Sequence, residues 1–279
     1  MKPIQFPRGK LSSSEFSAQE MQPAAEEARV AHAEGCEPAA EPKPVVASGR
    51  PLTPVVSIDP LRLESERILQ PGAPGPHGVH YKMLRTQVLR CLDKLGVNSL
   101  AVVGTAADTG KTLTAINLAI AIAADPEHSA LLIDLDLRKP RIHRRLGLEP
   151  GVGIDDCLRR THPLSAAMVR LSGYERLVVM PARERSLDSS ELLSTRYTND
   201  LIVEMRSRYK DRILLFDLPP VLQADDALVF ARHVQAVLIV VAEGRTRRDD
   251  LLRTVELLGE VPIVGTVLNG TREPVDIYY

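Results

Sequence analysis

Tryptophan is absent from this sequence of 279 residues, aromatic residues make up only 4% of it, and it has three cysteines. Cys36, Cys91 and Cys157 lie far apart, without a Cys-x-x-Cys pair and without metal-ligand spacing to the histidines, which argues against a disulfide framework or a structural metal. An excess of one charge is also lacking, because 35 Lys and Arg residues are balanced by 36 Asp and Glu residues. The overall charge therefore gives no reason to expect nucleic acid as a partner.

Long apolar runs are missing as well. The longest, at residues 113–124, has about a dozen residues, whereas a helix that crosses a membrane needs about 20. The N-terminus begins Met1-Lys2-Pro3 and lacks the basic start and apolar run of a secretory signal. We therefore expect a cytoplasmic protein, which a partner would have to recruit to the inner face of the plasma membrane if it works there.

Proline is concentrated at one end of the chain. Twelve of the 21 prolines fall in the first 76 residues, among Ala, Glu and Ser and with few aromatic residues. Such a segment buries too little apolar surface to offset the loss of conformational entropy. We expect residues 1–76 to form a disordered arm, either a solvated tail or a docking arm, and the Pro/Gly-rich residues 71–76 to mark the boundary of a domain over residues 77–279.

From residue 77 onward, helix-like and strand-like runs alternate. Apolar residues at helical spacing predict an amphipathic helix over about residues 79–95. Short runs rich in Val, Ile and Leu predict strands at Ser99–Val103, Ala130–Ile133, Leu177–Met180, Ile213–Phe216, Val237–Val241 and Ile263–Leu268. Further helices are expected at Thr112–Ala124, Asn199–Tyr209, Ala224–Arg232 and Arg247–Leu258. This alternation predicts an α/β fold with a mostly parallel sheet and helices on both faces.

A phosphate-binding loop is predicted where the first of these strands meets a helix. The run Gly104-Thr-Ala-Ala-Asp108-Thr109-Gly110-Lys111-Thr112 follows the strand, and the helix begins at once with Leu113. Backbone N–H groups of such a loop wrap phosphates, the lysine neutralises the β and γ oxygens, and the hydroxyl of Thr112 reaches Mg²⁺. The spacing differs from G-x-x-x-x-G-K-[ST] by one residue, so a chance Gly-Lys-Thr at a strand–helix turn is the alternative.

Acidic residues follow two other predicted strands. Asp134 and Asp136 come after the run Leu131-Leu132-Ile133, and Asp217 ends the run Ile213–Phe216 in the manner of a Walker B motif. Because ligands of open parallel sheets bind beyond the carboxyl ends of the strands, all three carboxylates are candidates for metal binding and catalysis. An Asp in this position is otherwise a turn former or a helix cap.

Together, these motifs resemble the bacterial tyrosine kinases (BY-kinases) of capsule and exopolysaccharide synthesis, within the MinD/ParA-like P-loop ATPases. The similarity extends from about residue 80 to the C-terminus and covers the loop with Gly110-Lys111-Thr112, the D-x-D-x-R run that ends at Arg138, and Asp217-Leu-Pro-Pro. Shorter matches are Tyr81–Thr86, Glu191-Leu192-Leu193, Asp226-Ala227-Leu228 and the last strand with Asn269. The five residues between Gly104 and Gly110 are common in this family. The E-x-x-R-x-x-R motif, which packs subunits into rings, is not matched, because its positions read Val79, Lys82 and Arg85.

The resemblance implies roles for individual residues. Lys111 and Thr112 would bind phosphate and Mg²⁺, Asp136 and Asp217 would hold the metal, and Asp134 would help to activate the attacking hydroxyl. Residues 104 and 108–113 would bind ATP, and Asn269 would contact the adenine. The acceptors would be Tyr278 and Tyr279, phosphorylated between neighbouring copies of a homo-oligomer. The partner would be the cytoplasmic tail of a transmembrane polysaccharide chain-length regulator.

Two rival functions keep the nucleotide site. One is a positioning ATPase of the MinD/ParA type, whose members place a lysine where this sequence has Ala106. The other is a regulatory ATPase of a polysaccharide machine that has no kinase activity. A separate basic group, which is either a solvated face or a docking patch for an acidic partner, consists of Arg138, Lys139, Arg141, Arg144 and Arg145.

Overall fold

An eight-stranded sheet is the centre of the fold in the computed structural model, which describes residues 53–72, 75 and 77–271. The strand order is β1-β4-β5-β3-β6-β2-β7-β8, and every neighbouring pair is parallel except β4 and β5. The strands are β1 Val55–Val56, β2 Ser99–Gly104, β3 Ser129–Asp134, β4 Val169–Leu171, β5 Leu177–Met180, β6 Arg212–Asp217, β7 Ala236–Ala242 and β8 Ile263–Asn269. The prediction of a mostly parallel sheet is confirmed, and all six predicted strands are present.

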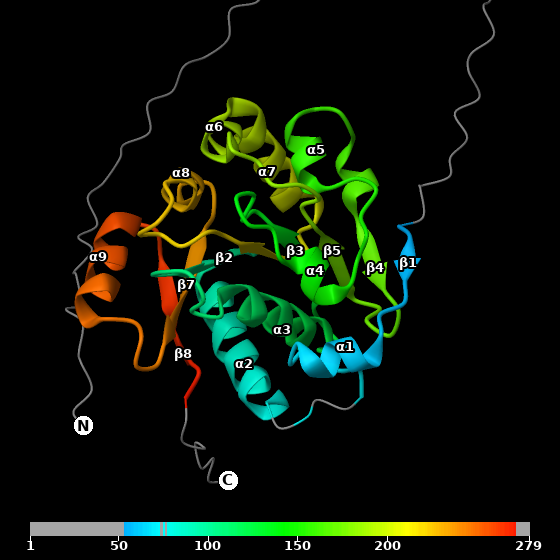
Figure 1. Ribbon diagram of the computed structural model, residues 1–279, viewed down its shortest axis with the longest axis horizontal. Coiled ribbons are helices and arrows are strands. Elements are labelled where there is room, and N and C mark those ends of the chain that lie inside the picture. Colours follow the sequence, from blue (N-terminus) through cyan, green and yellow to red (C-terminus); the bar gives the residue numbers. More distant parts are fainter. Residues whose placement is uncertain (1–52, 73–74, 76, 272–279) are drawn as a thin grey trace, which may run out of the picture. The chain divides into compact units, whose positions relative to one another are not determined.

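Helices cover both faces of the sheet (Figure 1). They are α1 Pro60–Ser65, α2 Gly78–Leu95, α3 Lys111–Ala123, α4 Ile142–Leu146, α5 Ile154–Leu158, α6 Ser189–Ser194, α7 Arg196–Arg208, α8 Asp226–Ala231 and α9 Arg248–Leu258, with a 3₁₀ turn at Leu164–Ala167. The five helices that the sequence predicts, α2, α3, α7, α8 and α9, are present, with ends shifted by a few residues. The strands β1 and β4 and the helices α1, α4, α5 and α6 were not predicted, since two to six residues show little periodic pattern.

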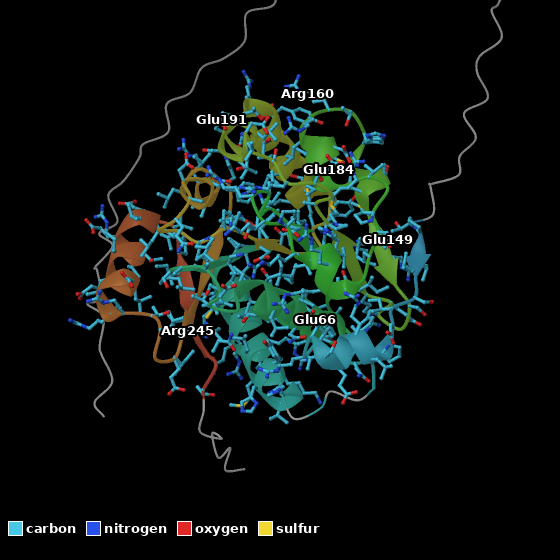
Figure 2. The ribbon with its side chains drawn as sticks, in the orientation of Figure 1. Glu66, Glu149, Arg160, Glu184, Glu191 and Arg245 are labelled. Atoms are coloured by element: carbon cyan, nitrogen blue, oxygen red, sulfur yellow. The ribbon has the colours of Figure 1, made fainter. Side chains whose placement is uncertain are left out.

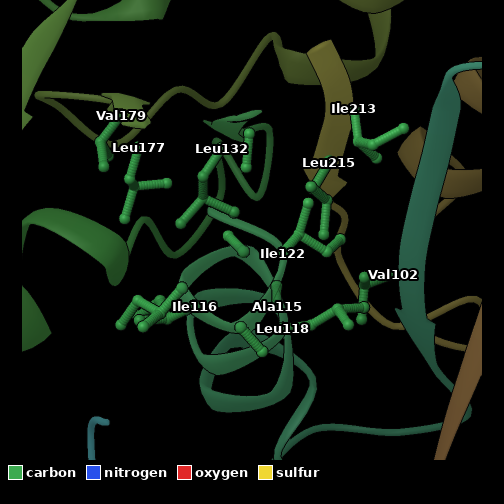
Figure 3. Packing of buried hydrophobic residues seen from close by; sticks show 14 of the residues in the cluster. Val102, Ala115, Ile116, Leu118, Ile122, Leu132, Leu177, Val179, Ile213 and Leu215 are labelled. Atoms are coloured by element: carbon green, nitrogen blue, oxygen red, sulfur yellow. The ribbon is translucent and has the colours of Figure 1, made fainter. Parts of the chain in front are cut away.

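Alternate residues of the central strands point into two separate cores. In β2, Leu100 and Val102 face the core that contains α2 and α3, whereas Ala101 and Val103 face the core that contains α7 and α8. Figure 3 shows the first core, where side chains of α3 lie against those of β2, β3, β5 and β6. Because both faces are covered, these strands read as continuous apolar runs. Burial on both sides holds the carboxyl ends of the strands rigidly beside one another.

The prediction that residues 1–76 form a disordered arm is wrong for residues 53–72. In this stretch β1 pairs with β4, and α1 begins with Pro60 behind the N-cap Asp59, whose side chain accepts from the Leu61 N–H. Three of its residues, Leu63, Ile68 and Leu69, are buried in the same core as α3. The composition of the whole first quarter of the chain concealed this local apolar cluster. Residues 1–52 lie outside the described residues.

The segment that follows α1 is attached to the core by hydrogen bonds to α3. Asn117 on α3 accepts from the Leu69 N–H at 2.9 Å and donates to the Arg67 carbonyl at 2.9 Å. The hydroxyl of Tyr174 donates to the Leu69 carbonyl at 2.7 Å. Buried backbone groups need such partners, so this part of the chain belongs to the folded domain.

Candidate active site

The loop between β2 and α3 is built by two glycines with little room around them. Gly110 has a φ of +91°, and a Cβ at this position would lie 1.8 Å from Nδ2 of Asn269. A Cβ on Gly104 would lie 2.3 Å from Oγ1 of Thr109. The side chain of Asn269 donates to the Thr109 carbonyl at 3.0 Å, so the end of β8 closes one side of the loop. This close packing explains why glycine is required at both positions.

The ammonium group of Lys111 lies among the strand-end carboxylates. Its Nζ donates to Oδ2 of Asp136 at 2.6 Å and lies 3.7 Å from Oδ1 of Asp217. Burial by itself lowers the pKa of Lys111, but the negative charges of Asp217 and Asp136 outweigh it, and the net shift is upward. The lysine is therefore held as a cation at the mouth of the loop, next to Thr112, whose hydroxyl is 3.4 Å away.

Asp217 is fully buried, and neither of its carboxylate oxygens has a hydrogen-bond partner. Burial raises its pKa, and the charge of Lys111 opposes this shift. Its strand β6 lies between β3 and β2, which aligns Asp217 with Asp134 on one side and with Val102 on the other. A buried carboxylate with a nearby ammonium but no hydrogen bonds is costly, which is the pattern expected of a group that also binds an ion.

Asp134 has a different set of contacts. One carboxylate oxygen accepts from the Asp136 N–H at 3.2 Å, and the other accepts from the N–H groups of Arg141 and Ile142 at 3.1 and 3.0 Å. Its side chain is fully buried, and burial and the charge of Asp217 raise its pKa well above the usual range. It shapes the turn from β3 into α4, whereas its expected role in activating a hydroxyl stays a prediction.

A cleft of about 220 Å³ opens beyond the ends of β2, β3 and β6. Of the predicted nucleotide-binding residues, the cleft is lined by Asp108, Gly110, Lys111, Thr112 and Leu113, together with the predicted carboxylate Asp136. The cleft is not lined by the other predicted residues. These are Gly104, Thr109, Asp134 and Asp217, which are buried, and Asn269, which packs against Gly110. Tyr278 and Tyr279 lie outside the described residues.

Several residues that line the cleft were not predicted as site residues. They are Ala107, Arg138, Lys139, Arg141, Arg145, Pro219, Pro220, Gln223 and Ala224. Pro219 and Pro220 follow Asp217 and Leu218, and the Val221 N–H donates to the Gly104 carbonyl at 2.9 Å, which joins the two loops. The sequence signals that could have found these residues are position after a strand-end Asp, and, for Ala107 and Arg138, membership of the loop and of the D-x-D-x-R run.

Three arginines of the basic group form ion pairs within the chain. Arg141 contacts Asp108 at 2.8 Å, and Arg145 contacts Glu66 at 2.6 Å. Arg138 donates to Asp226 at 2.9 Å and also contacts Asp225. These three arginines are thus paired within the chain and line the cleft, and both interpretations of the basic group, a solvated face and a docking patch, stay predictions. The pairing of Arg138 with Asp226 also explains why the Asp226-Ala-Leu motif accompanies the D-x-D-x-R run.

The oxygen donors around Lys111 fit a hard divalent cation. Thr112, Asp136 and Asp217 offer one hydroxyl and two carboxylates, the ligand types that Mg²⁺ prefers, and the Asp217 oxygens lack any other hydrogen-bond partner. Among the residues that the structure describes, however, no group of three or more His, Cys, Asp or Glu side chains is arranged to hold a metal. Convergence of all three strand-end carboxylates on one metal, as the sequence predicted, is therefore absent from this arrangement, and any Mg²⁺ must take further ligands from water and phosphate.

The fold and the loop define a P-loop nucleotide-binding domain with a Lys–Asp pair at its mouth. No protein-family model matches the chain. It is 28% identical to the tyrosine-protein kinase YwqD of Bacillus subtilis over 194 residues, 69% of this chain and 80% of that protein. It is 29% identical to the tyrosine-protein kinase wzc of Salmonella typhi, matching 64% of this chain and 24% of that protein. The succinoglycan biosynthesis transport protein ExoP of Rhizobium meliloti is 28% identical over 70% of this chain and 25% of its own length.

Solved structures agree with these sequence matches. The kinase domain of the Escherichia coli tyrosine kinase ETK superposes with a TM-score of 0.63 at 26% identity, over 71% of this chain and 78% of that one. The cell-division ATPase MinD of Pyrococcus furiosus shares the fold, with a TM-score of 0.52 at 22% identity over 61% of this chain and 71% of its own. The chain is thus a homologue of bacterial tyrosine-protein kinases with the fold of their kinase domain. It spans about a quarter of wzc and ExoP and most of YwqD.

Proposed function

We propose that this chain binds MgATP in the cleft and transfers the γ-phosphoryl group to a tyrosine hydroxyl. The observation that carries the proposal is the position of Lys111, whose ammonium contacts Asp136 and lies 3.7 Å from the buried carboxylate of Asp217. A lysine at the end of a glycine loop and a strand-end carboxylate are the two parts that phosphoryl transfer requires of a P-loop protein.

The chain's own groups would bind and orient the nucleotide. The loop from Gly104 to Thr112 offers backbone N–H groups and the N-terminus of the 13-residue helix α3 to the phosphates. Thr112, Asp136 and Asp217 would hold Mg²⁺, which would supply positive charge to offset the negative charge of the phosphates. Asn269 fixes the loop through Thr109, and in the proposed complex the adenine lies on the same side.

In the transfer step, the tyrosine oxygen forms a bond to the γ phosphorus while the bond from that phosphorus to the β-phosphate oxygen breaks, which leaves ADP. The phenolic proton passes to a carboxylate of the cleft. Two carboxylates are candidates. Asp136 lines the cleft, but it would also hold Mg²⁺, and its Oδ1 accepts from the Lys139 N–H. Asp134 would be free of the metal, but both of its oxygens accept from backbone N–H groups. When a phosphate takes over Lys111, Oδ2 of Asp136 loses its partner and becomes available.

The acceptors that we propose are Tyr278 and Tyr279 of a neighbouring copy. The test is incubation with MgATP followed by mass-spectrometric mapping of phosphotyrosine on the wild type, a Tyr278→Phe/Tyr279→Phe double variant and a Lys111→Met control. Phosphate on the two tyrosines of the wild type alone is the expected result. Phosphotyrosine in the double variant at wild-type level would reject these acceptors, and none in the wild type would reject the kinase function.

A regulatory ATPase without kinase activity is the second candidate, because the MinD fold is shared and the cleft serves hydrolysis as well as transfer. Release of phosphate from ATP with no phosphotyrosine on any protein would favour it. The comparison needs one assay that follows both products on the same sample.

We further propose that the protein works in exopolysaccharide or capsule export at the inner face of the plasma membrane. No helix in the described part of the chain is long and apolar enough to cross a bilayer, so recruitment would come from elsewhere. A transmembrane chain-length regulator, through its cytoplasmic tail, is the partner that the resemblance implies. Measuring kinase activity with and without such a tail tests this proposal, and full turnover of the isolated protein contradicts it.

A further inference from the structure

Arg145 is the basic residue of the cleft whose role the nucleotide-binding residues leave unexplained. It lies in the last turn of α4 and lines the cleft together with Lys111, Thr112 and Asp136. Its side chain is 27% exposed, and its Nε is buried without a hydrogen-bond partner. A guanidinium with an unused buried donor beside a phosphate-binding loop has spare capacity to bind an anion.

One edge of this guanidinium is held by Glu66. This residue belongs to residues 53–72, which lie N-terminal to the domain that the sequence predicted. Nη1 of Arg145 donates to Oε2 of Glu66 at 2.6 Å. Glu66 directly follows α1, which lies beside α4, and Figure 2 shows it between these two helices. A second contact from the same segment, Arg62 to the Arg144 carbonyl at 2.7 Å, holds the two helices together.

The segment is rigid enough to position a side chain. Asn117 and Tyr174 hydrogen-bond its backbone at Arg67 and Leu69, and Leu63 and Ile68 are buried beneath it. The backbone is therefore held in place both before and after Glu66 in the sequence. A carboxylate held in this way restricts the rotamers of its arginine partner and reduces the entropy lost when that arginine binds a ligand.

We infer that Arg145 contacts the terminal phosphoryl group of the bound nucleotide and that Glu66 is the residue that positions it. The inference rests on the proposed function, because it assumes a nucleotide in the cleft. Arg145 lines the cleft together with Thr112 and Asp136, two of the residues proposed to hold the metal, whereas Asn269 does not line it. The γ phosphate would lie beside this metal, where a planar guanidinium binds two oxygens at once.

An ion pair that only stabilises the fold is the competing explanation. Exposed ion pairs contribute little to the free energy of unfolding, and a pair with that role alone has no effect on which ligand binds. The pair formed by Arg159 and Asp188, with a contact of 2.8 Å, is of this kind, since neither residue lines the cleft. It therefore serves as the matched control.

The test is calorimetric titration with Mg²⁺ present, using ADP and a non-hydrolysable ATP analogue as probes. Arg145→Gln should weaken binding of the ATP analogue by about tenfold or more and binding of ADP much less, because ADP lacks the γ phosphate. Arg145→Lys should lose part of this preference, since an ammonium cannot bind two oxygens in the same way. Glu66→Gln should also reduce the preference, that is, the ratio of the affinity for the ATP analogue to the affinity for ADP. Arg159→Gln and Asp188→Asn should leave this ratio at the wild-type value.

Each result has a distinct meaning. If the wild type binds neither probe, the proposed function fails and the inference fails with it. If the wild type binds both and Arg145→Gln keeps the wild-type ratio of affinities, the inference fails alone. An unchanged ratio in Glu66→Gln, with a changed ratio in Arg145→Gln, rejects the positioning role of Glu66. Should Arg145→Gln fail to fold, the same ratio of affinities is measured on Arg145→Lys, which retains the charge, and a wild-type ratio in that variant rejects the inference.

Discussion

Lys111 and Asp136 form a 2.6 Å contact at the end of the glycine loop. A phosphate that enters the cleft must compete with this carboxylate for the same ammonium group. Since both partners are nearly buried, at 8% and 7% side-chain exposure, the pair is weakly screened by solvent. Nucleotide binding therefore exchanges one anionic partner of Lys111 for another, and the substitutions at this position report directly on that exchange.

Lys111→Met should lower phosphoryl transfer by about 100-fold or more, because it removes the cation aimed at the β and γ oxygens. It also removes the ammonium group that contacts Asp136 and Asp217. Turnover of ATP and affinity for ADP, measured together, check this prediction. Wild-type values for both would refute the assignment of the loop.

Asp217→Asn should change how stability depends on pH. The pKa of Asp217 is raised, first by burial, so the folded protein binds this proton more tightly than the unfolded chain does. The contribution to stability is complete below the unfolded pKa, near 3.8, and is lost as the pH rises through the raised folded pKa. The loss is about 1.4 kcal/mol for each unit by which the pKa is raised.

The asparagine variant lacks this titration, and it also removes a negative charge that raises the pKa of Asp134. Relative to the wild type, it should therefore gain in free energy of unfolding from acidic to neutral pH. Urea unfolding of nucleotide-free protein in a metal chelator, at a series of pH values, measures the difference. A difference that is the same at every pH contradicts the prediction.

Gly110→Ala should abolish nucleotide binding. Its Cβ would lie 1.8 Å from Nδ2 of Asn269, and its φ of +91° is strained for any other residue. In the double variant with Asn269→Ala the collision is removed, while a backbone strain of roughly 1–2 kcal/mol remains. Binding should then recover in part. No difference between the single and double variants would show that Asn269 is not the obstacle.

Asn117→Ala should destabilise the protein by about 1–3 kcal/mol for each of the two backbone groups left unpaired, the Leu69 N–H and the Arg67 carbonyl. Thermal unfolding gives the loss, and limited proteolysis should show faster cleavage between residues 60 and 75. Tyr174→Phe is the matched variant, because it removes a single hydrogen bond to the Leu69 carbonyl. An Asn117→Ala protein as stable as the wild type would mean that the segment is held in other ways.

The sequence predicted those elements whose signal is contained in neighbouring residues. The loop Gly104–Thr112, its strand and its helix are adjacent in the chain, and period and glycine spacing suffice to recognise them. The buried strands β3 and β6 are equally visible as apolar runs that end at Asp134 and Asp217. The short α1 was overlooked although Asp59-Pro60 is a helix-start signal, because the composition of the whole N-terminal quarter outweighed it.

The sequence by itself determined the class of domain, the nucleotide loop and the set of strand-end acids, because each depends on local spacing. Only the tertiary structure decided what those acids do. Strand order aligns Asp134 with Asp217, yet the two have different surroundings. The Asp134 oxygens accept hydrogen bonds from backbone N–H groups, whereas the Asp217 oxygens have no hydrogen-bond partner. The contact between Glu66 and Arg145 joins residues 79 positions apart. No period or motif encodes such a contact, because it exists only after the chain has packed both helices onto the sheet.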